Sequence, residues 1–186
     1  MLGYAFCGSF CTFGASFDVL ERLVSDGADV QPIMSERAYS TDTRFQSAKE
    51  FRDRVEALCK RKIIHSIEDA EPLGPKLPLS ALVIAPCTGN TLAKLAQGIT
   101  DTAVTMAAKA HLRSDRPLLI ALASNDAMSQ NLANVAALLN RKPVYFVPMR
   151  QDDPEGKPHS LVADMSKIPE ALKKLEKQTQ MRPLFL

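Results

Sequence analysis

The sequence predicts a three-layer α/β fold, in which an open parallel β-sheet of about six strands is covered by helices on both faces. Short runs rich in apolar and β-branched residues alternate with longer amphipathic runs along the chain. The strongest short runs, ALVIA at 81–85 and LLIALA at 118–123, are apolar at every position, as in parallel strands covered on both faces. A length of 186 residues, with no repeat or long linker, suits one domain.

The first part of the chain is predicted to form a strand, a helix and a second strand. The first strand covers 2–7, and a loop of glycine, serine and threonine connects it to an amphipathic helix that ends at Gly27. The second strand covers 29–34. The apolar positions of the helix fall on one face: Val19, Leu20, Leu23 and Val24.

A long, charged helix is predicted next. Either Thr41 or Thr43 begins it as an N-cap, and it runs to about Lys62. Residues 63–64 are a brief strand candidate, and 71–78 (EPLGPKLP) are expected to form a surface loop. The apolar stripe of the helix consists of Phe51, Val55 and Leu58.

The second half of the chain alternates strands and helices. Strands at 81–85, 118–123 and 144–147 are separated by amphipathic runs, so they are expected to pair in parallel. This arrangement is Rossmann-like or flavodoxin-like, and such sheets bind ligands beyond the carboxyl ends of their strands. Helices are predicted at 91–97, 102–112, 128–139 and 168–177.

Composition and charge exclude several classes of function. The content of 46% hydrophobic and 24% charged residues is ordinary, and a formal net charge of +2 provides no field that recruits nucleic acid or an anionic membrane. No apolar run reaches the ~18 residues that span a bilayer. The N-terminus lacks the basic segment and cleavage site of a signal peptide. Four cysteines without a metal-type pair indicate free thiols in the cytoplasm and no metal site.

Two of the loops at the carboxyl ends of the strands suit a phosphate group. In residues 8–14 (GSFCTFG), backbone N–H groups meet at a helix N-terminus, and Ser9 or Thr12 can donate further hydrogen bonds. A simple tight turn explains the same residues equally well. Ser35 ends the second strand, where its hydroxyl either reaches the same phosphate or, the reading favoured for this residue alone, caps a helix.

The most polar loop is 86–91 (PCTGNT), directly after the apolar strand at 81–85. Pro86 is expected to stop the strand, and Gly89 permits close approach of a ligand to the backbone. The alternative is that Asn90 or Thr91 only caps the next helix.

A further loop, 124–126, follows the strand at 118–123. Asp126 is expected to cap a helix there, which leaves Asn125 free to face a ligand. Together these loops predict a ligand site at one edge of the sheet.

The stretch APCTGNTLAKLAQGITDTAVTMAAKAHL at 85–112 resembles a segment of the homo-oligomeric flavin-containing cysteine decarboxylases and the flavin prenyltransferases. The likeness to the B subunits of dipicolinate synthase is closer, and it runs through nearly the whole chain. The segments that carry it, besides CTGNT, are SERAYSTDTRF at 35–45, IIHSIEDAEPLGPK at 63–76 and VYFVPMRQDDPEGKPHSLVADM at 144–165.

This resemblance implies a flavoprotein subunit that binds FMN and works with a dehydrogenase-like A subunit, which brings NADP. The implied reaction is the oxidation of dihydrodipicolinate, a small dicarboxylate, to dipicolinate during sporulation. The resemblance also implies a trimer-based homo-oligomer. A flavin-dependent decarboxylase, a prenyltransferase or a non-catalytic partner subunit remain alternatives.

The resemblance assigns roles to individual residues. His65 falls where the decarboxylases carry an active-site histidine, and a surface histidine is the alternative. Asn125 and Met128 match part of the decarboxylase substrate clamp, whereas Leu122, Ser124 and Ser129 depart from it. Gly89-Asn90 departs from the prenyltransferase pattern. Gly8, Ser9 and Ser35 are assigned to the FMN phosphate, and Thr88, Gly89, Asn90 and Thr91 to the ribityl and isoalloxazine groups.

A dicarboxylate substrate also needs a cation, for which the sequence offers Arg37, Arg113 and Arg150.

Overall fold

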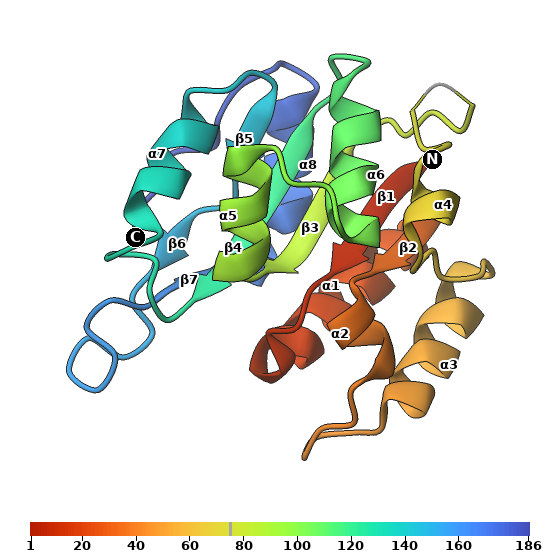
Figure 1. Ribbon diagram of the computed structural model, residues 1–186, viewed down its shortest axis with the longest axis horizontal. Coiled ribbons are helices and arrows are strands. Elements are labelled where there is room, and N and C mark those ends of the chain that lie inside the picture. Colours follow the sequence, from red (N-terminus) through yellow and green to blue (C-terminus); the bar gives the residue numbers. More distant parts are fainter. Residues whose placement is uncertain (75) are drawn as a thin grey trace.

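A mostly parallel sheet of seven strands forms the middle layer of the computed structural model, which describes residues 1–74 and 76–186 (Figure 1). The strand order is β2-β1-β3-β4-β7-β6, and β5 pairs with β4. Strands β1 to β5 pair with one another in parallel, whereas β7 runs antiparallel to both β4 and β6. The predicted three-layer, open and mainly parallel sheet is therefore confirmed.

The elements alternate along the chain as the periodicity predicts. The strands are β1 (Leu2–Phe6), β2 (Val30–Met34), β3 (Leu82–Cys87), β4 (Leu118–Ser124), β5 (Val144–Phe146), β6 (Met149–Arg150) and β7 (Leu161–Ala163). The helices are α1 (Phe13–Ser25), α2 (Glu36–Ser40), α3 (Ala48–Cys59), α4 (Ile67–Ala70), α5 (Gly89–Gln97), α6 (Ala103–Leu112), α7 (Leu132–Leu139) and α8 (Ile168–Leu175). Short 3₁₀ turns at Phe10–Thr12 and Met165–Lys167 precede α1 and α8.

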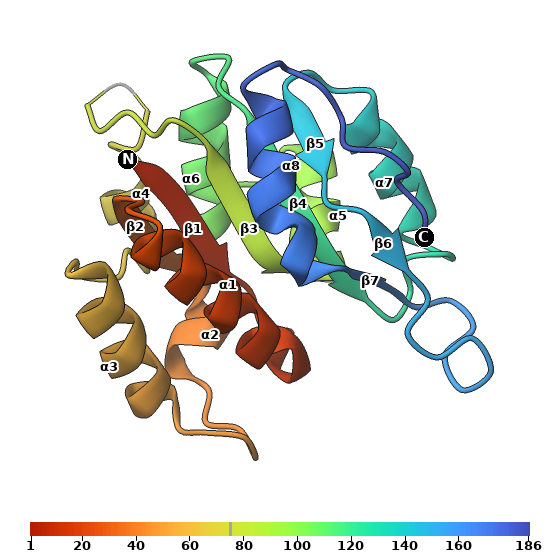
Figure 2. The same ribbon diagram turned by 180° about the vertical axis from the view of Figure 1, so that it is seen from behind.

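Alternate side chains of β1 divide the core into two halves. Tyr4 and Phe6 pack toward α1, α3 and α8, which cover one face of the sheet (Figure 2). Ala5 and Cys7 pack toward the face that α4 to α7 cover (Figure 1). The Tyr4 hydroxyl lies 3.0 Å from Ser16 Oγ on α1, and Ser16 in turn donates a 2.6 Å hydrogen bond to a carbonyl of β3. This buried contact fixes α1 across two strands.

The charged helix predicted from Thr41 or Thr43 to about Lys62 is present, but its start is wrong: α3 spans Ala48–Cys59, and the unpredicted helix α2 ends at Ser40, before either threonine. Ser47 caps α3, accepting a hydrogen bond from the Glu50 N–H at 3.2 Å while the Glu50 carboxylate accepts one from the Ser47 N–H at 3.0 Å. This capping box starts a new helix at a fixed point. The Thr43 hydroxyl instead stabilises the preceding turn.

Three other boundaries differ from the prediction. Pro86 does not stop β3, which continues to Cys87 through an irregularity in its pairing with β4; proline is tolerated at such places. The helix predicted from residue 128 begins at Leu132. The brief strand at 63–64 is a single bridge between Ile33 and Ile64. The loop predicted at 71–78 contains residue 75, which lies outside the described residues, and its other residues form turns and bridges.

The antiparallel strands β6 and β7 were not predicted. They flank the loop at 151–160, which extends beyond the rest of the molecule (Figure 1). The C-terminal tail adds a bridge from Phe185 to Met149. No helix in the part of the chain that the structure describes is long and apolar enough to cross a membrane.

Candidate functional site

The carboxyl ends of β1, β2 and β3 border a hollow of about 530 Å³, which we call the first hollow. Its lining combines hydroxyl groups, an aromatic ring and two cationic side chains, a mixture suited to an anion beside an apolar group. The lining residues are Gly8, Phe10, Ser35, Glu36, Arg37, Thr41, Thr88, Asn90, Thr91, Lys94 and Thr102.

Helix α2 presents two of these groups. Ser35 is its N-cap and accepts a 3.3 Å hydrogen bond from the Ala38 N–H, so the capping interpretation is confirmed. Its hydroxyl proton remains available for a second bond. Arg37 is exposed, and in the described ranges no carboxylate pairs with it, whereas Lys94 lies 2.8 Å from Asp101. Arg37 is therefore the cation that an anion in the first hollow meets first.

Helix α5 begins on a cap that was not predicted. Thr88, rather than Asn90 or Thr91, accepts a hydrogen bond from the Thr91 N–H at 3.3 Å. The Thr88 hydroxyl lies 3.2 Å from Thr91 Oγ1, which donates to the buried Cys7 Sγ at 3.3 Å. Because the capping role falls to Thr88, the exposed side chain of Asn90 is left free at the mouth of the hollow.

A second hollow, of about 500 Å³, continues from the first toward β4. Gly8, Phe10, Thr88 and Asn90 line both, so the two form one continuous surface across the strand ends. The loop at 151–160 contributes the remaining wall. The residues that line only the second hollow are Ser9, Cys11, Thr12, Gly89, Ala123, Ser124, Asn125, Asp126, Asp152, Lys157 and Val162.

A polar network closes the floor of the second hollow. The Asp126 carboxylate accepts hydrogen bonds from Ser124 Oγ and, at 2.9 Å, from Asn131 Nδ2. The Ser124 hydroxyl first, and the Asn131 amide to a lesser extent, hold the pKa of Asp126 below its ordinary value. The network packs directly on Gly89, where an added Cβ would lie 2.7 Å from Asn131 Nδ2 and 2.8 Å from Asp126 Oδ1. A side chain at position 89 therefore requires these hydrogen-bonded side chains to rearrange.

The structure gathers all but one of the predicted site residues. Gly8, Ser35, Thr88, Asn90 and Thr91 line the first hollow, and Gly8, Ser9, Thr88, Gly89, Asn90 and Asn125 line the second. Asp126, expected as a helix cap, instead accepts hydrogen bonds within the turn that precedes α7.

His65 lines neither hollow of its own chain. Its exposed ring stacks on Tyr39, with centroids 3.8 Å apart and planes at 22°, and the Arg52 guanidinium covers Tyr39 with its carbon 4.4 Å from the ring centroid.

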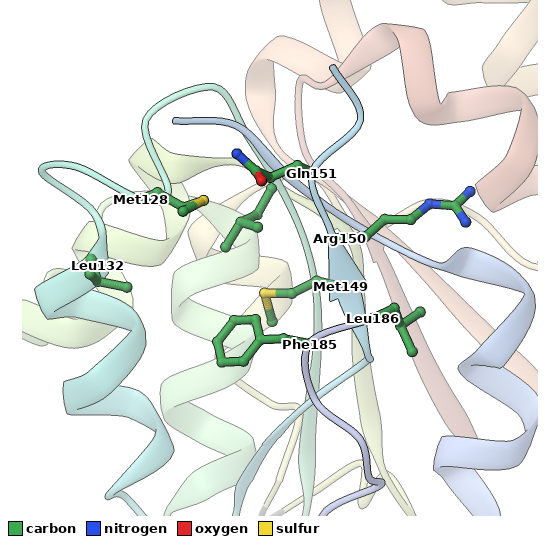
Figure 3. Close-up of a pocket in the computed structure, with 8 residues that line it drawn as sticks. Met128, Leu132, Met149, Arg150, Gln151, Phe185 and Leu186 are labelled. Atoms are coloured by element: carbon green, nitrogen blue, oxygen red, sulfur yellow. The ribbon is translucent and has the colours of Figure 1, made fainter. Parts of the chain in front are cut away.

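A third hollow, of about 340 Å³, lies apart from these and is mainly apolar (Figure 3). Met128 and Leu132 border one side, and Met149 and Phe185 form its base (Figure 3). Arg150 belongs to this region, but its guanidinium points away from the apolar side chains (Figure 3).

Comparisons with known proteins place this geometry in a family. The family model described as Flavoprotein matches residues 2–179. The chain belongs to the Flavoprotein family. The B subunit of dipicolinate synthase from Bacillus subtilis (strain 168) is 43% identical over 185 residues, which cover 100% of this chain and 92% of that protein.

Solved structures of similar proteins agree with this family. The B subunit of dipicolinate synthase from Bacillus halodurans C has a TM-score of 0.91 and 38% identity, covering 100% of this chain and 95% of that chain. The FMN-dependent cysteine decarboxylase SpaF has a TM-score of 0.65 and 25% identity, covering 94% and 96%.

The residues present fit the flavin that this family name implies. The first hollow offers the Ser35 hydroxyl and the Arg37 guanidinium to a phosphate group, and α1 directs its N-terminus to the same edge. The second hollow shares four lining residues with the first and offers amide groups and the ring of Phe10 to a larger polar ring system. One elongated ligand could therefore place its anionic end in the first hollow and its ring system in the second.

The four cysteines differ in burial, so they should differ in their reaction with a thiol-alkylating reagent. Burial raises the pKa of the Cys7 and Cys59 thiols to about 11 and that of Cys87 well above its ordinary value, whereas Cys11 is exposed. A thiol with a pKa of about 11 is only about one thousandth thiolate at pH 8. We expect iodoacetamide to label Cys11 alone in the folded protein, as measured by mass spectrometry, and Cys11→Ser to remove the label. Rapid labelling of buried Cys7 or Cys87 would contradict this prediction.

Proposed function

We propose that this chain is the flavin-binding B subunit of a dipicolinate synthase. With a dehydrogenase-like A subunit that brings NADP, it oxidises dihydrodipicolinate to dipicolinate. The observation that carries the proposal is the 43% identity, over the whole chain, to the B subunit of the Bacillus subtilis dipicolinate synthase. The two joined hollows support it because they offer anion-binding groups at one end and a polar, partly aromatic surface at the other.

The proposed reaction removes one hydride and one proton from the dihydropyridine ring. The hydride would pass to bound FMN or to the NADP that the A subunit brings, and the proton to a base or water. The contribution of this chain is to hold and orient the two ring systems. Ser35 and Arg37 would bind the phosphate of the flavin, and Asn90 and Asn125 would contact its polar groups and the substrate. The Asp126 carboxylate, which is ionised at neutral pH, would keep the Ser124 and Asn131 side chains in place.

The first test is cofactor uptake. We expect the purified chain to quench FMN fluorescence in a titration that saturates at one flavin per chain, because the hollows present the hydrogen-bond donors that FMN requires. An absence of flavin in the purified protein, combined with no quenching on titration, would contradict the cofactor assignment.

The second test is the variant Asn90→Ala, made in the complex with the A subunit. Asn90 is exposed and caps nothing, so folding and assembly should be unaffected. We expect the rate of dipicolinate formation, followed by its ultraviolet absorbance, to fall by about tenfold or more, as for loss of one oriented hydrogen bond. The exposed Asn140, which follows α7 at its C-terminal end, provides the control Asn140→Ala. Full activity of the Asn90→Ala complex would indicate that this chain is a non-catalytic partner of the A subunit.

A flavin-dependent decarboxylase is the second candidate, favoured by the 25% identity to SpaF. Ser124 stands where the decarboxylase clamp carries a methionine, and it is already bound to Asp126. Turnover of a cysteinyl peptide by this chain alone would support the second candidate over the first.

A further inference from the structure

The proposed substrate carries two carboxylates, and its site therefore requires a cation. The structure separates the three arginines that the sequence offered. Arg113 follows α6 before β4 begins, at the edge of the sheet opposite the hollows. Arg150 lies at the third hollow and points away from its apolar side chains (Figure 3). Arg37 lines the first hollow beside Ser35, where the flavin phosphate is proposed to bind.

Lys157 is the one cationic side chain that lines the second hollow among the residues described. It belongs to the loop at 151–160, and its Nζ lies 3.1 Å from an Asp152 oxygen. Its side chain is half exposed, at 50%, so an incoming anion can reach it. No arginine shares this wall of the hollow in the part of the chain that the structure describes.

The two carboxylates near this lysine are bound in different ways. Asp126 already accepts hydrogen bonds from Ser124 and Asn131 on the floor. Asp152 is the direct partner of Lys157, and Ser160 lies close enough to lower its pKa, although that approach falls short of a complete hydrogen bond. The Asp152 carboxylate raises the pKa of Lys157. Both members of the pair are therefore charged at neutral pH, and an exposed pair of this kind is weak enough to exchange partners.

We propose that Lys157 binds a carboxylate of the small dicarboxylate substrate in the second hollow, exchanging its contact with Asp152 for one with the substrate. This inference rests on the proposed function. The exchange replaces one exposed ion pair with another, and Asp152, whose side chain is 33% exposed, would then be solvated by water. The substrate ring would lie beside Lys157 and Val162, next to the flavin ring in the same hollow. The second carboxylate would face the Ser9 hydroxyl and the Asn125 amide, which line the same hollow, because the Thr12 hydroxyl already donates to the Ser9 carbonyl at 2.8 Å.

The test uses the assembled complex with the A subunit and compares Lys157→Ala with Lys157→Arg. We expect Lys157→Ala to raise the KM for dihydrodipicolinate about 10- to 100-fold, the size of a lost charge-assisted hydrogen bond. Lys157→Arg keeps the charge and should stay within about threefold of wild type. Lys173→Ala, which removes an exposed lysine from α8, should leave the KM unchanged.

Binding provides a second readout that does not depend on turnover. Titration calorimetry should show weaker binding of dipicolinate to the Lys157→Ala complex, while its FMN content stays that of wild type. A wild-type KM and wild-type dipicolinate affinity in Lys157→Ala would overturn the assignment of this lysine. Failure of the Arg variant to restore the KM would also overturn it, because the role of the residue would then not be its charge. A wild-type complex that forms no dipicolinate would instead refute the proposed function itself.

Discussion

Replacing Gly89 with alanine is expected to destabilise the protein by about 1–3 kcal/mol and to prevent flavin uptake, because it overpacks a filled space. The new Cβ would meet Ser124 Oγ, Asn131 Nδ2 and Asp126 Oδ1, the last two at 2.7 and 2.8 Å. These atoms are hydrogen-bonded to one another, so none can yield without breaking the network. The side chains of Ser124, Asp126 and Asn131 must therefore rearrange, and the first two line the second hollow.

Gly14→Ala is the matched control for this substitution. Gly14 also lies in the first turn of a helix, and nothing stands within 4 Å of its added Cβ. Alanine should stabilise α1 there by at most about 1 kcal/mol, through its better helix propensity. Urea unfolding measures both stabilities, and an FMN titration measures the site. A Gly89→Ala protein with wild-type stability and flavin affinity would show that the network at the floor of the second hollow is not as tight as its distances imply.

The fold was predictable because its signals are local. The parallel strands are apolar on both faces, and each helix between them shows a single apolar stripe, so the alternation is visible in the sequence. Helix α2 was not predicted, and the start of α3 was misplaced although Ser47 and Glu50 form a capping box at the usual spacing. Strands β6 and β7 have two and three residues, which is too short for any periodicity to appear.

The position of the site was predictable, but not which residue performs each task. Thr88 and Asn90 are both good capping residues, and only the backbone conformation assigns the cap to Thr88. Gly89 was expected to admit a ligand, whereas the structure shows that it also admits the Asp126 network, a contact between segments distant in sequence. Lys157 lies in a loop whose composition is typical of solvent-exposed turns, so nothing local indicates that it faces the hollow.

Phe51→Ala is expected to have the largest effect on stability, about 3–5 kcal/mol, because it empties the centre of an aromatic cluster. Phe51 is 2% exposed and stacks on Phe13 with centroids 4.7 Å apart. It also meets Phe6 edge-on at 5.2 Å. Large side chains surround the vacated volume on all these sides, so the surrounding structure can collapse only in part.

The same substitution should also weaken flavin binding, although Phe51 lines neither flavin hollow. Phe13 is the first residue of α1, and the loop that leads into it supplies Gly8 and Phe10 to both hollows. Loss of the Phe51 ring removes the support behind that loop, whereas Phe51→Leu retains most of the volume and should cost less in both properties. Thermal unfolding and FMN titration of the two variants separate these effects. If Phe51→Ala lowers stability by several kcal/mol but leaves flavin affinity unchanged, the loop after β1 is positioned by the sheet alone.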